Sequence, residues 1–242
     1  MERLDKVVSK SKGVSRSEAR GLILRGLISV NGGVVRDIGA KVNFSVDEIS
    51  FKGDDLSYKE HIYIVMNKPK GVLSASEDKR TNTVVDLLDD SAKRRNPFPV
   101  GRLDKNTTGM LILTDDGDFA HRLLSPKKKV PKEYIAVLDG EITSTVISGF
   151  EKGVTLADGT KLSPAKLTVL DSPFVAGVTI IEGKYHQIKR MFGVFGLGVN
   201  ELSRVSFGGL KIPSDLKEGQ WRELNKAELS KLLETAGLCT DK

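Results

Sequence analysis

The stretch GRLDKNTTGMLILT at residues 101–114 places an aspartate, Asp104, in a polar loop between two predicted strands. A loop held between strands is where a rigid scaffold presents a reactive side chain, and Arg102 and Lys105 can keep a carboxylate there ionised. Such a carboxylate can act as a nucleophile. The other interpretation is structural, an aspartate that caps a turn through a following threonine, and residue chemistry alone leaves the two equally supported.

A second basic cluster, GKYHQIKRMF at residues 183–192, leads into a predicted helix. The apolar stripe of that helix has the spacing i, i+3, i+4, i+7 and consists of Ile188, Met191, Phe192 and Phe195. At about 100° per residue, Lys189 falls beside this stripe and Arg190 points away from it. We therefore expect Lys189 to be the cation available to a buried carboxylate, and Arg190 to lie on a solvated helix face.

Tyr134 is a third candidate, in the strand-like segment KEYIAVL at residues 132–138. Its neighbours on the same strand face would be Ala136 and Leu138, because side chains alternate along a strand. Most tyrosines in such a setting belong to a core or to a sheet surface. Tyr134 by itself therefore gives only a weak indication of chemistry.

The sequence gives no indication of a metal or of an organic cofactor. Its three histidines lie far apart, without the short spacing of a zinc pair. The acidic run at residues 115–118 lacks the alternating carboxylates and terminal Glu of an EF-hand loop, and helix capping by Asp116 or Asp118 is the better interpretation. Glycine-rich nucleotide-binding signatures are absent as well.

The elements that must position these residues begin with a basic N-terminal segment. Residues 1–42 contain nine Lys and Arg against four Asp and Glu, which accounts for +5 of the net +6 of the whole chain. Their pattern predicts two short helices and a hairpin around Asn31-Gly32, with Ser15 and Glu18 in capping-box spacing. A solubilising charged surface is one reading of the basic residues, and a surface that binds a polyanion is the other. The cations of that candidate surface are Arg3, Lys6, Arg16 and Arg20.

A polar segment without periodicity at residues 51–60 is the best candidate for a linker and places a domain boundary near Tyr58. Beyond it, strands are expected within residues 62–66, 98–100, 110–114, 133–138, 165–170, 174–181 and 199–207. Helices are expected at residues 83–89, 118–124, 186–195 and 226–235, the last capped by Asn225. The strands do not alternate strictly with helices. The sequence therefore predicts an α+β fold, with a small domain at 1–58 and a larger one at 59–242 that has a mixed, mostly antiparallel sheet and flanking helices.

The composition is that of a soluble globular protein, with 39% hydrophobic and 29% charged residues among 242. The single cysteine, Cys239, cannot form an internal disulfide, which fits a reducing compartment. The charged N-terminus lacks the apolar core of a signal peptide, and no apolar run approaches the length of a membrane span. We therefore expect a cytoplasmic protein.

Taken together, three motifs resemble those of the pseudouridine synthases, and most closely the RsuA-like branch that modifies ribosomal RNA. GRLDKNTTGMLILTDDG resembles the catalytic motif of the family, KEY its tyrosine motif and EGKYHQIKRM its third motif. The segments RLDKVVSK and GVSRSEARGLILRGLISVNG resemble the S4-type RNA-binding domain of ribosomal proteins and of this enzyme branch. The resemblance implies an S4-type (alpha-L) domain followed by a pseudouridine synthase catalytic domain.

The resemblance also implies roles for individual residues. Asp104 matches the catalytic nucleophile, Tyr134 the ring that packs on the target base, and Lys189 the cation paired with Asp104. Related branches have arginine at that last position, so the contact would be made by Lys189 or by Arg190, which otherwise counts among the RNA-binding residues. Arg102 matches the arginine that fills the space left by the flipped base.

The implied activity is the isomerisation of a uridine to pseudouridine, which requires a flipped base and an ionised aspartate but no metal or organic cofactor. The implied partner is ribosomal RNA. The 16S target of the small subunit is favoured, because large-subunit relatives often carry a basic C-terminal extension and LLETAGLCTDK is not one. Nothing in the sequence demands a dimer, so we expect a monomer without membrane contact.

Three other functions compete with this one. They are a synthase for the 23S RNA of the large subunit, a non-catalytic RNA-binding factor of ribosome assembly, and a carboxylate-dependent hydrolase. The second is opposed by the presence of Asp104, Tyr134 and Lys189 together. The third would require a second acid at a defined separation from Asp104, and the sequence shows none nearby.

Overall fold

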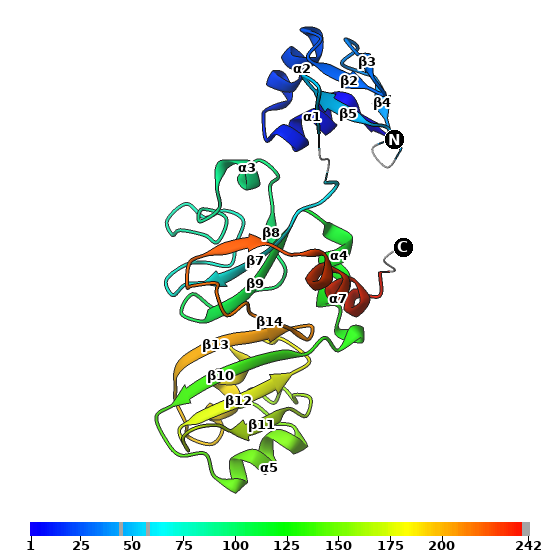
Figure 1. The fold of residues 1–242 in the computed structure, drawn as a ribbon. Coiled ribbons are helices and arrows are strands. Elements are labelled where there is room, and N and C mark those ends of the chain that lie inside the picture. Colours follow the sequence, from blue (N-terminus) through cyan, green and yellow to red (C-terminus); the bar gives the residue numbers. More distant parts are fainter. Residues whose placement is uncertain (44–45, 57–58, 239–242) are drawn as a thin grey trace. The chain divides into compact units, whose positions relative to one another are not determined.

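The computed structural model describes residues 1–43, 46–56 and 59–238, so Tyr58 and Cys239 lie outside the described residues. The chain forms two compact units (Figure 1). The first consists of Met1–Ile62 and Leu88–Pro97, and the second of Tyr63–Leu87 and Phe98–Lys242. The segment Leu88–Pro97 therefore groups with the N-terminal unit, although it follows the first strand of the second unit in the chain.

The N-terminal unit combines short helices with a small antiparallel sheet of order β3-β2-β5-β6, and β1 pairs with β4. Its helices are α1 (Leu4–Lys12), α2 (Arg16–Leu24) and α3 (Asp90–Lys93). Its strands are β1 (Glu2–Arg3), β2 (Ile28–Val30), β3 (Gly33–Val34), β4 (Lys41–Val42), β5 (Ile49–Phe51) and β6 (Asp54–Asp55).

Two sequence predictions for this unit are confirmed. Ser15 and Glu18 form the capping box of α2, each side chain accepting a hydrogen bond from the backbone N–H of the other residue. The hairpin at Asn31-Gly32 joins β2 to β3. The unit has its own apolar core, formed by the residues Leu4, Val7, Val8, Ala19, Ile23, Ile28, Val42 and Ile49.

The second unit is built on a nine-stranded sheet, which confirms the predicted mixed, mostly antiparallel architecture. The order is β11-β12-β10-β13-β9-β7-β15, with β14 beside β13 and β8 beside β9, and only β13 and β9 pair in parallel among the described strands. The strands are β7 (Tyr63–Lys68), β8 (Phe98–Pro99), β9 (Thr108–Thr114), β10 (Lys132–Leu138), β11 (Lys166–Val169), β12 (Val175–Ile180), β13 (Val199–Phe207), β14 (Leu210–Lys211) and β15 (Trp221–Glu223).

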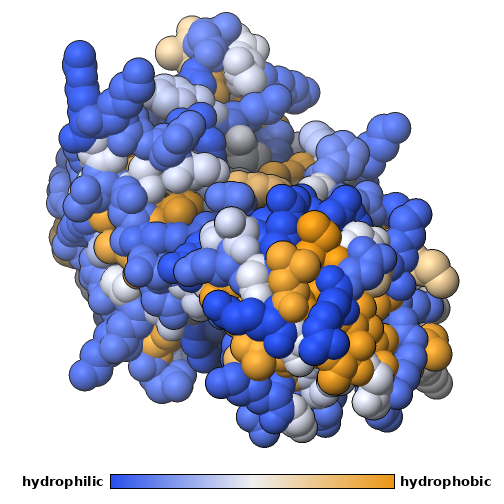
Figure 2. Space-filling view, turned by 90° about the horizontal axis from the view of Figure 1, so that it is seen from above, coloured by the Kyte–Doolittle hydropathy of each residue, from blue (hydrophilic) through white to orange (hydrophobic). Residues whose placement is uncertain are grey.

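Helices flank this sheet, as predicted. They are α4 (Gly117–Leu124), the 3-10 helix η1 (Pro126–Lys128), α5 (Ser144–Lys152), α6 (Gln187–Gly193) and α7 (Lys226–Ala236). Asp116 caps α4 and Asn225 caps α7, each by accepting a backbone N–H, as the sequence indicates. The helix α5 was not predicted. In the described part of the chain, no helix has the length and apolar character needed to cross a membrane. The face of the molecule shown in Figure 2 is largely hydrophilic, with a few apolar patches.

The helix expected at residues 83–89 is wrong, because this segment forms a turn. Thr83 donates its backbone N–H and its hydroxyl to the Asp86 carboxylate, and the Asp86 N–H returns a bond to the Thr83 backbone oxygen. Such local side-chain hydrogen bonds offer the backbone an alternative to the helical ladder. Thr83 also forms an isolated parallel β-bridge with Leu73, so the segment begins in an extended conformation.

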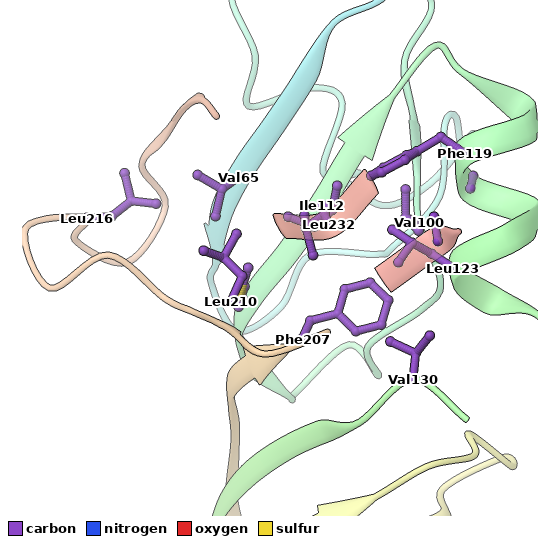
Figure 3. Close-up of a cluster of buried hydrophobic side chains, with 13 residues drawn as sticks. Val65, Val100, Ile112, Phe119, Leu123, Val130, Phe207, Leu210, Leu216 and Leu232 are labelled. Carbon is purple, nitrogen blue, oxygen red and sulfur yellow. The ribbon is translucent and has the colours of Figure 1, made fainter. Parts of the chain in front are cut away.

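One apolar core cluster of the second unit lies between the sheet and the helices α4 and α7 (Figure 3). Ile112 of β9 and Phe207 of β13 meet Phe119 of α4 and Leu232 of α7 in this cluster. Tyr63 packs edge-on against Phe119, with ring centroids 5.0 Å apart. This packing holds β9 and β13 in place. The loop of Asp104 leads into β9, and β13 pairs with β10, the strand that carries Tyr134.

Gly109 permits the parallel pairing of β9 with β13. It pairs with Arg204, its φ is +99°, and a Cβ built on it would lie 2.3 Å from the Arg204 backbone oxygen. An L side chain is therefore excluded both by its conformation and by the neighbouring strand.

We predict that Gly109→Ala lowers the free energy of unfolding by about 3 kcal/mol, because the two strands must separate to admit the methyl group. Chemical denaturation followed by the fluorescence of Trp221, the single tryptophan, measures this. Gly117→Ala is the matched control, since its Cβ would meet nothing within 4 Å and its φ is not positive. Equal stability of the two variants would contradict the prediction.

Candidate functional site

A small pocket, with a cavity volume of about 70 Å³, opens where the loop before β9 meets β10, β13 and the start of α6. It brings together Arg102, Asp104 and Tyr134, three of the candidates from the sequence. Its lining residues are Arg102, Leu103, Asp104, Thr107, Tyr134, Ile180, Gly183, Lys184, His186, Gln187, Ile188 and Leu202. Of these residues, Asp104 is the only carboxylate.

The loop that carries Asp104 is fixed by hydrogen bonds on both sides of it. The Leu103 N–H donates to the Ser74 hydroxyl over 3.1 Å, and that buried hydroxyl donates back to the Leu103 carbonyl over 2.9 Å. The Thr107 N–H donates to the Asp104 backbone oxygen. The Thr107 hydroxyl is buried without a hydrogen-bond partner, so it does not cap the Asp104 side chain. That side chain is 29% exposed and faces the pocket.

A buried ammonium group lies behind this loop. Lys68 has no exposed surface, and its Nζ donates to the carbonyl oxygens of Pro69, Lys105 and Thr107 at 2.9–3.1 Å. Burial lowers the pKa of Lys68 to about 8, although the negative charges of Asp104 and Glu218 raise it. The three donors of an ammonium match these three carbonyls, so Lys68 ties the strand β7 to the loop of Asp104.

Two groups with nitrogen atoms approach the Asp104 carboxylate. Lys189 Nζ lies 3.9 Å from Oδ2, and His186 Nε2 lies 3.5 Å from Oδ1. Arg190 forms an ion pair with Asp158 instead, so the cation beside Asp104 is Lys189, as the helical spacing predicts.

Tyr134 forms part of the pocket wall and is 8% exposed. It lies on β10 between Val178 of β12 and Arg204 of β13. Arg204 is buried as well, and its Nε donates to the Met110 carbonyl over 2.7 Å. Burial and the positive charge of the nearby Arg204 together lower the pKa of Lys132 to about 8, although the charge of Glu182 raises it. The strands behind Tyr134 therefore carry positive charge.

Three residues of this site are not indicated by the sequence motifs, namely Lys68, His186 and Gln187. The sequence feature that could have pointed to Lys68 is its place at the end of the apolar strand segment IYIVMNKP. The buried Gln187 accepts the Lys184 N–H and donates to Glu182, which closes the turn before α6. Among the described residues no group of three or more His, Cys, Asp or Glu could hold a metal ion.

The predicted polyanion-binding residues of the N-terminal unit share an anionic centre. The Asp5 carboxylate has no exposed surface and accepts hydrogen bonds from Arg3, Arg16 and Arg20 at 2.9–3.2 Å. The three guanidinium groups remain about half exposed, at 46–50%. Lys6 pairs with Glu2. Burial raises the pKa of Asp5, but the hydrogen bonds from the three arginines outweigh it and hold that pKa well below the ordinary 3.8.

The chemistry that this geometry allows is that of one carboxylate beside a cation. Asp104 is accessible, and the Lys189 ammonium lies 3.9 Å from its carboxylate. Hydrolysis of a glycosidic bond by paired acids needs a second carboxylate at a defined separation. The lining of the pocket provides no such partner, so the site suits nucleophilic or electrostatic catalysis by Asp104 alone.

Comparisons with known proteins agree with the two units. The family model described as RNA pseudouridylate synthase matches residues 62–193, and the S4 domain model matches residues 2–48. A crystal structure of a pseudouridylate synthase superposes with a TM-score of 0.68 and 33% identity, covering 96% of this chain and 100% of that chain.

Three curated bacterial proteins are similar over nearly their full lengths. An uncharacterised RNA pseudouridine synthase of Bacillus subtilis is 44% identical, covering 96% of this chain and 98% of the relative. The ribosomal large subunit pseudouridine synthase B of the same organism is 36% identical, with 96% of each chain covered. The ribosomal small subunit pseudouridine synthase A of Escherichia coli is 34% identical, covering 96% of this chain and all of the relative.

We predict that Lys68→Met lowers the free energy of unfolding by about 3 kcal/mol or more, because it leaves three buried carbonyls without a donor. Denaturation followed by Trp221 fluorescence gives this value, and amide hydrogen exchange at residues 103–107 reports the loop. Lys132→Met is the matched control, since the Lys132 ammonium donates to the carbonyl of Val130 only. A loss no larger than that of the control would be inconsistent with this role of Lys68.

We predict that α1 and α2 lose stability in acid. Since the pKa of Asp5 is lower in the folded than in the unfolded state, the unfolded chain binds the proton first as the pH falls below about 3.8. The contribution of Asp5, about 2–4 kcal/mol above that pH, then declines. Hydrogen exchange of residues 4–24 between pH 5 and 2 measures it. Asp5→Asn should remove most of this pH dependence, and Asp55→Asn should leave it; equal acid sensitivity of all three proteins would refute the prediction.

Proposed function

The chain belongs to the RNA pseudouridylate synthase family, and from this premise we propose that it converts one specific uridine of ribosomal RNA to pseudouridine, with Asp104 as the catalytic carboxylate. The observation that carries the proposal is the setting of Asp104. It is the only carboxylate of the pocket lining, its loop is tied to Lys68 and Ser74, and the Lys189 ammonium lies 3.9 Å away.

The reaction exchanges one bond of the uracil ring for another. The bond between N1 and the ribose C1′ breaks, the detached ring rotates, and C5 then bonds to C1′ while a proton passes from C5 to N1. Asp104 acts by adding to C1′ or to C6, or by stabilising positive charge on the ribose. Each of these roles requires the ionised carboxylate, beside which the Lys189 ammonium lies.

Tyr134 and Arg102 serve the flipped nucleotide in this proposal. The Tyr134 ring is buried and lines the pocket, so it offers the base a wall beside Asp104. Arg102 is exposed at the rim of the same pocket and fills the place that the base leaves in its stack. Flipping a base costs a few kcal/mol, which contacts to the phosphate backbone can offset.

The S4 domain supplies such contacts in the proposal. Arg3, Arg16 and Arg20 carry three positive charges around the single buried charge of Asp5, which leaves their exposed halves with a net positive field. Lys6 of α1 is the fourth cation of this surface, although Glu2 offsets its charge. Arginine side chains held in fixed positions lose less conformational entropy when they bind phosphate than freely moving ones do.

We take 16S RNA of the small subunit as the target, since the small-subunit synthase of Escherichia coli is matched over its whole length. A 23S target is the second candidate, favoured by the 36% identity to the large-subunit synthase of Bacillus subtilis. The protein acts in the cytoplasm, where both RNAs are assembled into subunits, and it acts as a monomer.

We predict that cells lacking this protein lose pseudouridine at one site of 16S RNA, and that the wild-type gene restores it. Asp104→Asn should not restore it, because the amide cannot supply the negative charge, and its rate in vitro should fall by about 10³-fold or more. Pseudouridine mapping of both rRNAs is the measurement. Loss at a 23S site would support the second candidate instead, and an unchanged map of both RNAs would refute the proposed function.

Two variants control this experiment. Asp171→Asn changes an exposed aspartate in the turn between β11 and β12 and should complement fully. Lys189→Met should fail, because it removes the cation beside Asp104. Complementation by Lys189→Met equal to wild type would contradict the role given to this lysine.

A further inference from the structure

Tyr185 is an aromatic residue that the site described above does not use. It is 75% exposed, although it stands in the chain between Lys184 and His186, which both line the pocket. A tyrosine ring has a large apolar surface and is seldom left this open to water. Packing therefore does not explain why this exposed tyrosine lies beside the pocket.

The rings of Tyr185 and His186 are stacked on each other. Their centroids lie 3.9 Å apart and their planes differ by 19°. His186 covers one face of the Tyr185 ring, and the high exposure of Tyr185 leaves its other face accessible. His186 Nε2 also lies 3.5 Å from Asp104 Oδ1. The two stacked rings therefore extend from the Asp104 carboxylate to the solvent.

The backbone at His186 is held in an unusual conformation. Its φ of +48° and ψ of 33° lie in the left-handed region, which side chains other than glycine seldom adopt. The start of α6 does not account for this, because the His186 side chain makes no capping hydrogen bond. Backbone strain of this kind is concentrated at binding and catalytic sites. Here its result is that the imidazole ring faces Asp104 and carries Tyr185 on its outer side.

The charges around the two rings suit a nucleic acid. Lys184 and Arg102 are exposed at the pocket, and Lys189 lies beside Asp104. A phosphate backbone entering the pocket therefore meets cations next to an open aromatic face. Unpaired bases in RNA bind proteins by stacking on such faces, and every base has a face that can do so.

We propose that Tyr185 and His186 form a stacking platform for an unpaired base that adjoins the target uridine in the RNA strand. This inference rests on the proposed function, since it takes the neighbour of the flipped uridine as its ligand. The platform holds the strand next to the pocket while the target base occupies the space beside Asp104. It adds an anchor to the RNA contacts of the S4 domain, within the catalytic unit itself.

The test is a binding measurement in the Asp104→Asn protein, where turnover does not interfere. The probe is a short single-stranded oligouridylate with one central 2-aminopurine, whose fluorescence is quenched when it stacks on an aromatic ring. Adding Tyr185→Phe should preserve the quenching. Adding Tyr185→Ala should abolish it and weaken binding by about 5- to 100-fold, the range for loss of one base–aromatic stack. Quenching and affinity unchanged by Tyr185→Ala would overturn the proposal.

Two further variants separate stacking from other effects. Phe174→Ala removes an exposed ring that does not line the pocket and should leave quenching intact. His186→Phe keeps a ring under Tyr185 and should retain the quenching, whereas His186→Ala should lose most of it. If His186→Phe loses as much as His186→Ala, the imidazole acts by its own chemistry and the platform is refuted. The fluorescence of Trp221 verifies that each variant is folded.

The two proposals can fail separately. If the rRNA maps show no lost site while Tyr185→Ala still abolishes the quenching, Tyr185 stacks on an RNA base but the proposed function fails, and with it the assignment of that base as the neighbour of a target uridine. If the mapped site is modified equally by wild type and Tyr185→Ala at RNA concentrations below saturation, and the quenching is also equal, the platform fails and the proposed function stands.

Discussion

The candidate site depends on one buried charge, the ammonium of Lys68. This group has no exposed surface, and it donates to three backbone carbonyls, two of which belong to the loop of Asp104. A charge removed from water is costly unless its hydrogen bonds are replaced, so the loop must keep its carbonyls turned inward. The direction of the Asp104 side chain follows from that requirement. The core between the sheet, α4 and α7 in turn holds β9, the strand that continues from this loop.

The same arrangement recurs with opposite sign in the N-terminal unit. There a buried carboxylate, Asp5, is surrounded by three arginines that keep about half of their side chains in water. In both places one buried ion orders several groups at the surface of a unit, and the ordered groups are the ones to which a function is assigned. The difference lies in the partners: Lys68 binds backbone and fixes a conformation, whereas Asp5 binds side chains and leaves positive charge exposed.

Local patterns predicted much of the fold because they depend on neighbouring residues only. The capping box at Ser15 and Glu18, the cap at Asn225 and the choice of Lys189 over Arg190 all follow from helical spacing. The turn at residues 83–89 was missed because the bonds between Thr83 and Asp86 compete with a helix that the pattern allows. Lys68, and the link between Asp5 and the arginines of α2, could not be predicted. Both depend on contacts between elements that are distant in the sequence.

The parallel pairing of β9 with β13 also has a consequence for the order of events during synthesis. It joins Thr108 and Gly109 to Ser203 and Arg204, and Leu202 of β13 lines the pocket. The loop of Asp104 is therefore complete long before the strand that closes the sheet beside it has been made. A nascent chain that ends before residue 202 contains Asp104 but lacks Leu202 of the pocket lining and the strand β13 beside β9. The pocket beside Asp104 is therefore completed only near the end of translation, long after the N-terminal unit has been made.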